Sequence, residues 1–318
     1  MFTTRRHILA LAGSPLLARI AAERFDVDRI LSINTGKPAN TYSRKYVAGA
    51  SFLLFSIPLG SKSGVGSAFT VIEETKDAVS IRFGAGSYPE SARGLNRLGF
   101  IQEAVLESGT GQASECAYLA FMTTSQEKNL DQAKRALENS GDVLPYTAAQ
   151  GCGKRGRFAS RVERLQFPSR YTWRDVEALV EKARAAMASS GPLPDGQAPA
   201  PEASTFLYSV RRALLDPDRR SVSCLFFNGK QFRLETQKEA DPAAGAHFTS
   251  RRLVARPEDV LRLDATLTNQ HTGEKTPFRI WYEAGAGHEP PLRFDYQAKS
   301  FLRLTFEADG PAVAKEKA

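Results

Sequence analysis

The feature that most constrains this fold is an alternation of apolar and polar residues in the C-terminal third. Between Leu261 and Leu267 every second residue is apolar, which is typical of a strand with one buried and one solvated face. Upstream, Asn228-Gly229 separates two apolar runs and favours a hairpin, because both residues tolerate the positive φ angles of a type I′ turn. We therefore predict a mainly β (α+β) fold, with a curled antiparallel sheet or an open barrel.

Two to three helices are expected to cover this sheet. From Thr172 to Gly191 apolar residues recur at intervals of three and four, with Thr172 placed as the cap and Asp175 in the first turn. A second helix is predicted from Ser204 to Leu215, and a third begins at Ser125 and ends near Ser140.

The same patterns divide the chain into segments. Four prolines with almost no large apolar side chain predict a mobile loop or linker at 191–202. The expected division is an export signal at 1–22, an N-terminal β-rich half with two helices at 23–190, the linker at 191–202, a C-terminal helix and β meander at 203–309, and a disordered tail at 310–318.

The N-terminus matches a twin-arginine export pattern. Arg5 and Arg6 precede a short apolar run that ends near Ala18, and small residues follow at Ala21-Ala22. We expect a periplasmic or secreted protein. The run is shorter than the ~20 apolar residues that cross a bilayer, so no stable membrane span is predicted.

Net charge, cysteine count and histidine spacing limit the partners and cofactors that we expect. A formal charge of +8 over 318 residues, without a helix-turn-helix or RNA-binding signature, argues against nucleic acid. The three cysteines allow at most one disulfide, for which Cys116 and Cys152 are the hypothesised pair. The histidine spacing indicates no metal site, and no cofactor is expected.

Several C-terminal motifs resemble a known family. They are Asn228-Gly229-Lys230 at the hairpin, Phe278-Arg279-Ile280-Trp281-Tyr282, Pro290-Pro291-Leu292-Arg293, and the helix Thr205-Phe206-Leu207-Tyr208-Ser209-Val210-Arg211-Arg212. Together they resemble the uncharacterised envelope β-proteins of Gram-negative bacteria that are grouped as a domain of unknown function. The resemblance implies a secreted, largely antiparallel fold without a known active site, and it does not extend to the first half of the chain.

Two residue sets are candidates for binding. Aromatic side chains on the concave side of a curled sheet would hold an apolar or amphipathic ligand, such as a lipid or another envelope component; these are Trp281, Tyr282, Phe294 and Phe301. A basic cluster would dock an anionic partner; it consists of Lys154, Arg155, Arg157, Arg161 and Arg164. The leading hypothesis is a non-catalytic exported binding protein.

Three further motifs allow alternative interpretations. Gly151 to Gly156 fits G-x-G-x-x-G, but the residues that follow do not predict a phosphate-binding helix. The glycine-rich segment Gly60 to Gly66 lacks the spacing of a phosphate loop and is interpreted as a loop between strands. Ser125 and Lys128 match the S-x-x-K of serine acyl-transfer enzymes, which is the enzymatic alternative; the serine is also explained as a helix cap.

Overall fold

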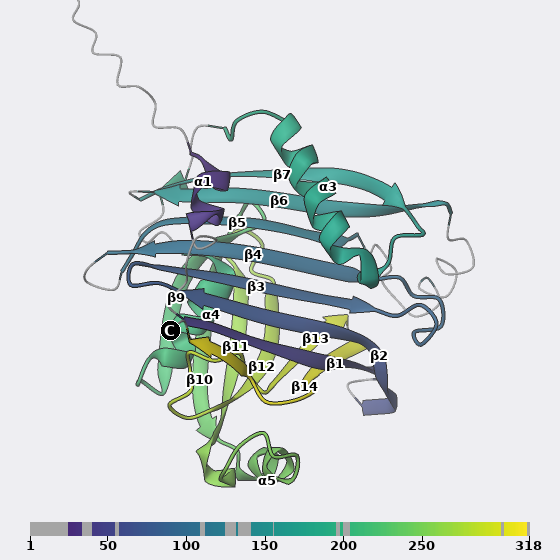
Figure 1. The fold of residues 1–318 in the computed structure, drawn as a ribbon, viewed down its shortest axis with the longest axis vertical. Coiled ribbons are helices and arrows are strands. Elements are labelled where there is room, and N and C mark those ends of the chain that lie inside the picture. Colours follow the sequence, from purple (N-terminus) through teal and green to yellow (C-terminus); the bar gives the residue numbers. More distant parts are fainter. Residues whose placement is uncertain are drawn as a thin grey trace, which may run out of the picture.

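The computed structural model shows one antiparallel sheet of 15 strands that curls into a nearly closed barrel, with four α-helices in the described residues (Figure 1). This confirms the predicted fold class. The strands of the C-terminal half run crosswise behind those of the N-terminal half. The structure describes residues 25–33, 40–54, 57–108, 112–124, 132, 141–154, 156–194, 198–199, 204–299 and 302–316.

The N-terminal half is an antiparallel meander, since each strand pairs with the one before it in the chain. Its strands are β1 (Asn40–Leu54), β2 (Ile57–Glu74), β3 (Ala78–Ser87), β4 (Leu98–Glu107), β5 (Ala113–Thr123), β6 (Val143–Lys154) and β7 (Arg157–Pro168). From the segment predicted as a linker, β8 (Ala198–Pro199) adds to the beginning of β7.

The C-terminal half is a second meander that returns to the first strand. Its strands are β9 (Arg220–Phe227), β10 (Lys230–Ala240), β11 (Val260–Asn269), β12 (Lys275–Glu283), β13 (Arg293–Lys299) and β14 (Leu302–Ala308). The predicted hairpin turn is present between β9 and β10, with φ of 52° at Asn228 and 70° at Gly229. β14 pairs with β1, so the two halves share one sheet.

Two segments differ from the sequence-based expectation because they pair with β1. The tail was expected to be disordered from 310 to 318, but β15 (Val313–Glu316) pairs with the first residues of β1. The segment Gly60 to Gly66 was expected to be a loop, but it continues β2 beside β1. Gly64 has a φ of +71° next to a register shift, so its glycine accommodates a bulge within the strand.

The hypothesised disulfide is wrong, and the strand register explains why. Cys116 on β5 lies opposite Gly153, whereas Cys152 on β6 lies opposite Ala117. Successive residues of a strand point to opposite faces of the sheet, so the two thiols lie on different faces. Both are free and buried.

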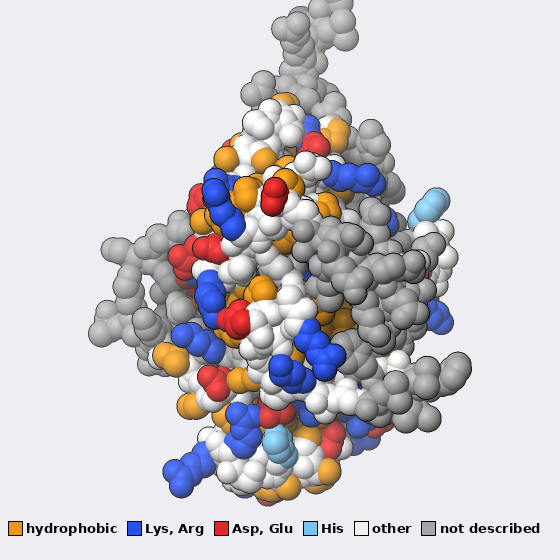
Figure 2. All heavy atoms as spheres, turned by 90° about the vertical axis from the view of Figure 1, so that its right-hand side faces the viewer, with side chains coloured by type: hydrophobic (Ala, Val, Ile, Leu, Met, Phe, Trp, Pro, Cys, Tyr) orange, Lys and Arg blue, Asp and Glu red, His pale blue; other side chains and the backbone are white. Residues whose placement is uncertain are grey.

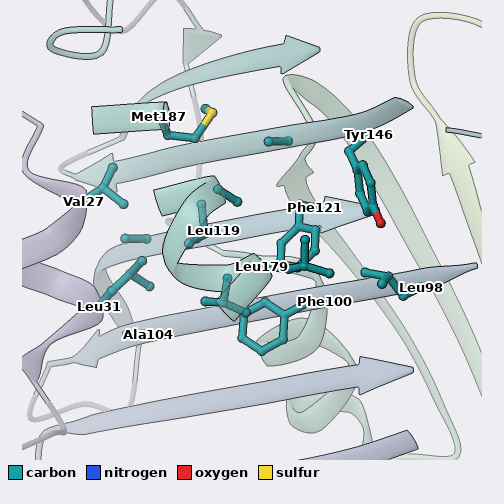
Figure 3. Packing of buried hydrophobic residues seen from close by; sticks show 14 of the residues in the cluster. Val27, Leu31, Leu98, Phe100, Ala104, Leu119, Phe121, Tyr146, Leu179 and Met187 are labelled. Atoms are coloured by element: carbon teal, nitrogen blue, oxygen red, sulfur yellow. The ribbon is translucent and has the colours of Figure 1, made fainter. Parts of the chain in front are cut away.

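The outer face of the N-terminal half is covered by α1 (Val27–Leu31) and α3 (Val176–Ser189) (Figure 3). The predicted cap of α3 is confirmed at the preceding 3₁₀ turn, η2 (Trp173–Asp175). The Asp175 carboxylate accepts the Thr172 N–H at 2.9 Å, and the Thr172 hydroxyl accepts the Arg174 N–H at 3.3 Å. Leu179, Ala183 and Met187 are fully buried against the sheet.

Trp173 anchors this layer and requires glycine beneath it. Its indole N–H donates to the Ser67 hydroxyl at 2.7 Å, and its ring stacks on Phe69. A Cβ at Gly86 would lie 2.5 Å from the Trp173 side chain, so only glycine fits there.

On the inner face, α4 (Phe206–Leu215) lies between the two halves of the sheet. Val210, Ala213 and Leu214 pack on the C-terminal strands. Among the described residues, the barrel closes beside this helix without a continuous ladder between β7 and β9. Instead Phe158 stacks on Phe226 with ring centroids 4.4 Å apart, and the Phe226 N–H donates to the Ser204 carbonyl at 3.1 Å.

One helix, α5 (Pro242–Ser250), was not predicted from the sequence. Asp241 caps it by accepting the Ala244 N–H at 3.0 Å, and Pro242 occupies its first turn. Phe248 is fully buried in a cluster with Trp281. The helix expected from Ser125 to Ser140 falls in a stretch of which only Gln132 is described.

Candidate functional site: a groove on the outer face of the C-terminal half

The structure does not bring the predicted aromatic residues to one site. Trp281 is on the outer face, where its N–H donates to Asp241 at 2.9 Å and the Arg293 guanidinium covers its ring. Tyr282 is on the inner face and is buried in the cluster that packs against α4. Phe294 is partly buried on the inner face, where its ring contacts those of Tyr46 and Phe83. Phe301 lies outside the described residues.

The described members of the predicted basic cluster lie on β6 and β7 and are divided between the two faces of the sheet. Arg161 donates to the Gly191 carbonyl at 2.9 Å, and Lys154 pairs with Glu115 at 3.1 Å. Arg164 is exposed on the opposite face, an odd number of residues away. Arg157 is also exposed and shares the face of Arg161; Arg155 lies outside the described residues, as do Ser125 and Lys128.

Surface charge is mixed elsewhere as well. Figure 2 shows basic and acidic side chains side by side on the face that it presents, with small apolar patches between them. This visible face therefore carries no large field of one sign among the described residues.

Buried ionisable groups inside the barrel serve to hold α4. The fully buried Glu103 carboxylate of β4 accepts the Thr205 hydroxyl and the N–H groups of Leu207 and Tyr208, the latter two at 3.0 Å. Burial raises the pKa of Glu103 to about 7, against the opposing effect of these hydrogen bonds. Farther along the helix, Arg211 forms a buried ion pair with Glu74.

His288 and two buried cysteines are further ionisable groups among the described residues. The Nδ1 atom of His288 lies 3.2 Å from Glu74 and from Arg211. Burial raises the pKa of both buried thiols, that of Cys152 to about 12, so they are protonated at neutral pH. Among the residues that the structure describes, no three His, Cys, Asp or Glu side chains are grouped to hold a metal ion.

A groove of about 620 Å³ crosses the strands of the C-terminal half from β9 to β14. The register places two rows of outward-facing side chains along it. The first row is Val222, Glu235, Thr266 and Pro277, and the second is Arg220, Gln237, Asp264, Arg279 and Asp295. Arg303 and Gln297 extend the lining on β14 and β13.

The carboxylates of this groove already have cationic partners. Glu235 pairs with Arg233 at 2.8 Å, Asp264 with Arg279 at 3.1 Å, and the buried Asp295 with Arg293 at 2.9 Å. The guanidinium groups of Arg220 and Arg303 have no hydrogen bond or ion pair with any described residue. Among the described residues, the groove therefore retains two side-chain cations without a partner.

Sequence reasoning missed this site for a definable reason. The alternation from Leu261 to Leu267 correctly indicated a solvated polar face, and that face includes Arg262, Asp264 and Thr266. The groove depends on which residues of six strands stand side by side, and local patterns do not give that register.

No helix in the described parts of the chain is long and apolar enough to span a membrane.

The comparisons with known proteins do not assign this chain to a family. No protein-family model and no curated protein matches the chain. Among solved structures it is similar to a beta-barrel-like protein of domain of unknown function DUF1849 from Brucella abortus, with 9% identity and a TM-score of 0.39 over 88% of this chain and 100% of that chain.

Proposed function

We propose that this is an exported, non-catalytic β-protein of the bacterial envelope that binds an envelope ligand or partner in the groove across β9–β14. The groove itself carries the proposal, because it combines a hollow surface with cations that the described residues leave unpaired. The twin-arginine pattern at Arg5-Arg6 supports the export part. The C-terminal motifs that resemble the uncharacterised envelope family are consistent with it.

The ligand is assigned to the groove and not to the hollow of the barrel. Of the aromatic side chains expected to line the hollow, the three that are described, Trp281, Tyr282 and Phe294, are engaged in packing, and α4 occupies the space between the two halves. The groove also offers apolar surface, since Val222 is 59% exposed and Pro277 is exposed in the same row. An amphipathic ligand would therefore find polar and apolar contacts there.

The test uses a residue that lines the groove and a matched residue beside it. Thr266 and Thr268 lie on the same face of β11, but only Thr266 lines the groove. Thr266→Trp should fill the groove, whereas Thr268→Trp adds the same indole outside it. We expect wild type and Thr268→Trp to cosediment with isolated membranes or with purified cell-wall sacculi, and Thr266→Trp to remain in solution.

Two outcomes would overturn the proposal. One is equal cosedimentation of both variants, and the other is no cosedimentation of the wild type. Organic extracts of the purified proteins provide a second readout: lipid that copurifies equally with wild type and Thr266→Trp would move the ligand to the barrel interior.

A further inference from the structure

We propose that the ligand of this groove is an acidic glycan chain that lies across the strands and contacts Arg220 at one end and Arg303 at the other. This inference rests on the proposed function and names the ligand class of the same groove. It is carried by the placement of the two unpaired arginines and by the direction of the groove.

The two arginines lie at opposite ends of one face. Arg220 is on β9, and Arg303 is on β14 opposite Gln297. Five inter-strand spacings separate β9 from β14, which at about 4.8 Å each gives a span of about 24 Å. A ligand that engages both guanidiniums must therefore be elongated and anionic along its length.

The ion pairs of the groove favour an anion over a cation. Because Glu235, Asp264 and Asp295 are each held by an arginine, a cationic ligand would have to displace an existing partner. An anionic ligand gains charge-assisted hydrogen bonds from Arg220 and Arg303 without breaking any contact between described residues.

The direction of the groove favours a glycan over an extended peptide. A peptide gains affinity on a sheet mainly by pairing its backbone with a free strand edge. The groove instead crosses β10 to β13, each of which already pairs on both sides. What it offers are side-chain groups that suit the oxygen atoms of a sugar chain, among them the hydroxyl of Thr266 and the guanidinium groups of Arg220 and Arg303.

The test measures binding of oligogalacturonate long enough to span about 24 Å, with a neutral oligosaccharide of equal length and oligoglutamate beside it. Lys275→Ala is the matched control, because Lys275 is an exposed cation on the same face outside the groove. We expect Arg220→Ala and Arg303→Ala each to weaken oligogalacturonate binding about three- to tenfold, and Lys275→Ala to change it less than twofold. Urea melts of the three variants would confirm that all remain folded.

The outcomes separate this inference from the proposed function. If Thr266→Trp blocks binding to envelope material but both arginine variants bind it like wild type, the glycan inference fails and the groove proposal stands. If oligoglutamate binds as tightly as oligogalacturonate with the same arginine dependence, the assignment to a glycan is refuted. If all three cation variants weaken binding equally, the attraction is non-specific and the inference also fails.

Discussion

The buried carboxylate of Glu103 makes the stability of this protein depend on pH in a direction that can be worked out. Its pKa is about 7 in the native state, mainly because burial disfavours the ionised form, against 4.5 as the ordinary value. Between these two pH values the native state holds a proton that the unfolded chain releases. The contribution of Glu103 to the unfolding free energy should therefore be most favourable at or below about pH 4.5. It should fall as the pH rises towards 7 and stay constant above that pH.

The size of the effect follows from the same difference. At about 1.4 kcal/mol per pH unit, the interval from 4.5 to about 7 corresponds to a loss of about 3 kcal/mol of unfolding free energy. The hydrogen bonds from Thr205, Leu207 and Tyr208 oppose this loss by stabilising the ionised carboxylate. This loss of unfolding free energy is therefore a net value, in which the cost of desolvating the carboxylate outweighs its attraction to the positive end of α4.

The assay compares urea melts of wild type and Glu103→Gln at several pH values from 4.5 to 7.5. Other carboxylates titrate in this range, so the informative quantity is the difference between the two proteins. Glutamine presents an amide to the N-terminal donors of α4 and should be less stable than wild type at pH 4.5, with a deficit that shrinks as the pH rises. Glu181→Gln, on the exposed side of α3, is the control for loss of a carboxylate elsewhere.

The result that would refute this reasoning is a deficit that grows with pH. Wild type would then gain stability over the variant as Glu103 ionises, and the interaction with the helix N-terminus would outweigh the cost of burial. A constant deficit would place the native pKa of Glu103 at its ordinary value.

Three further predictions concern the core, a glycine contact and export. Leu263→Ala should lower the unfolding free energy by about 2 to 5 kcal/mol in urea melts, because the side chain is fully buried; a silent change would contradict the core assignment. Gly86→Ala should cost about 1 to 3 kcal/mol by clashing with the indole above it, whereas Gly99→Ala, whose Cβ would be 3.7 Å from its nearest neighbour, should cost less. A reporter fused to the first ~30 residues should cross the membrane, and changing both Arg5 and Arg6 to lysine should retain it in the cytoplasm. Retention of the unmodified fusion would contradict the export prediction.

The sequence predicted those parts of the fold whose signals are local. The Asn228-Gly229 turn, the alternation in β11, and the cap of α3 at Thr172 are each confirmed, because a few neighbouring residues determine them. The glycine-rich start of β2 and the strand β15 were missed because their only support is pairing with β1. Tertiary pairing overrides weak local preference in such segments.

The candidate site was hidden for the same reason. Trp281 and Tyr282 were both predicted to line one ligand site. Because consecutive residues of a strand face opposite sides of the sheet, the two side chains belong to different clusters. No local pattern links Arg220 with Arg303, since they come to lie on one face only after six strands have aligned.

The pairing of β1 with β14 has a consequence for the order in which the chain can fold. Tyr46 finds its partner Ala308 roughly 260 residues later, and contacts of such separation form slowly because a long loop must close first. The meander from β2 to β7 has only local pairings and can form while the rest of the chain is still emerging from the ribosome. Until β14 arrives, β1 presents an open edge of polar backbone groups, so during synthesis this strand is the place where a chaperone would bind or an intermolecular misassembly would begin.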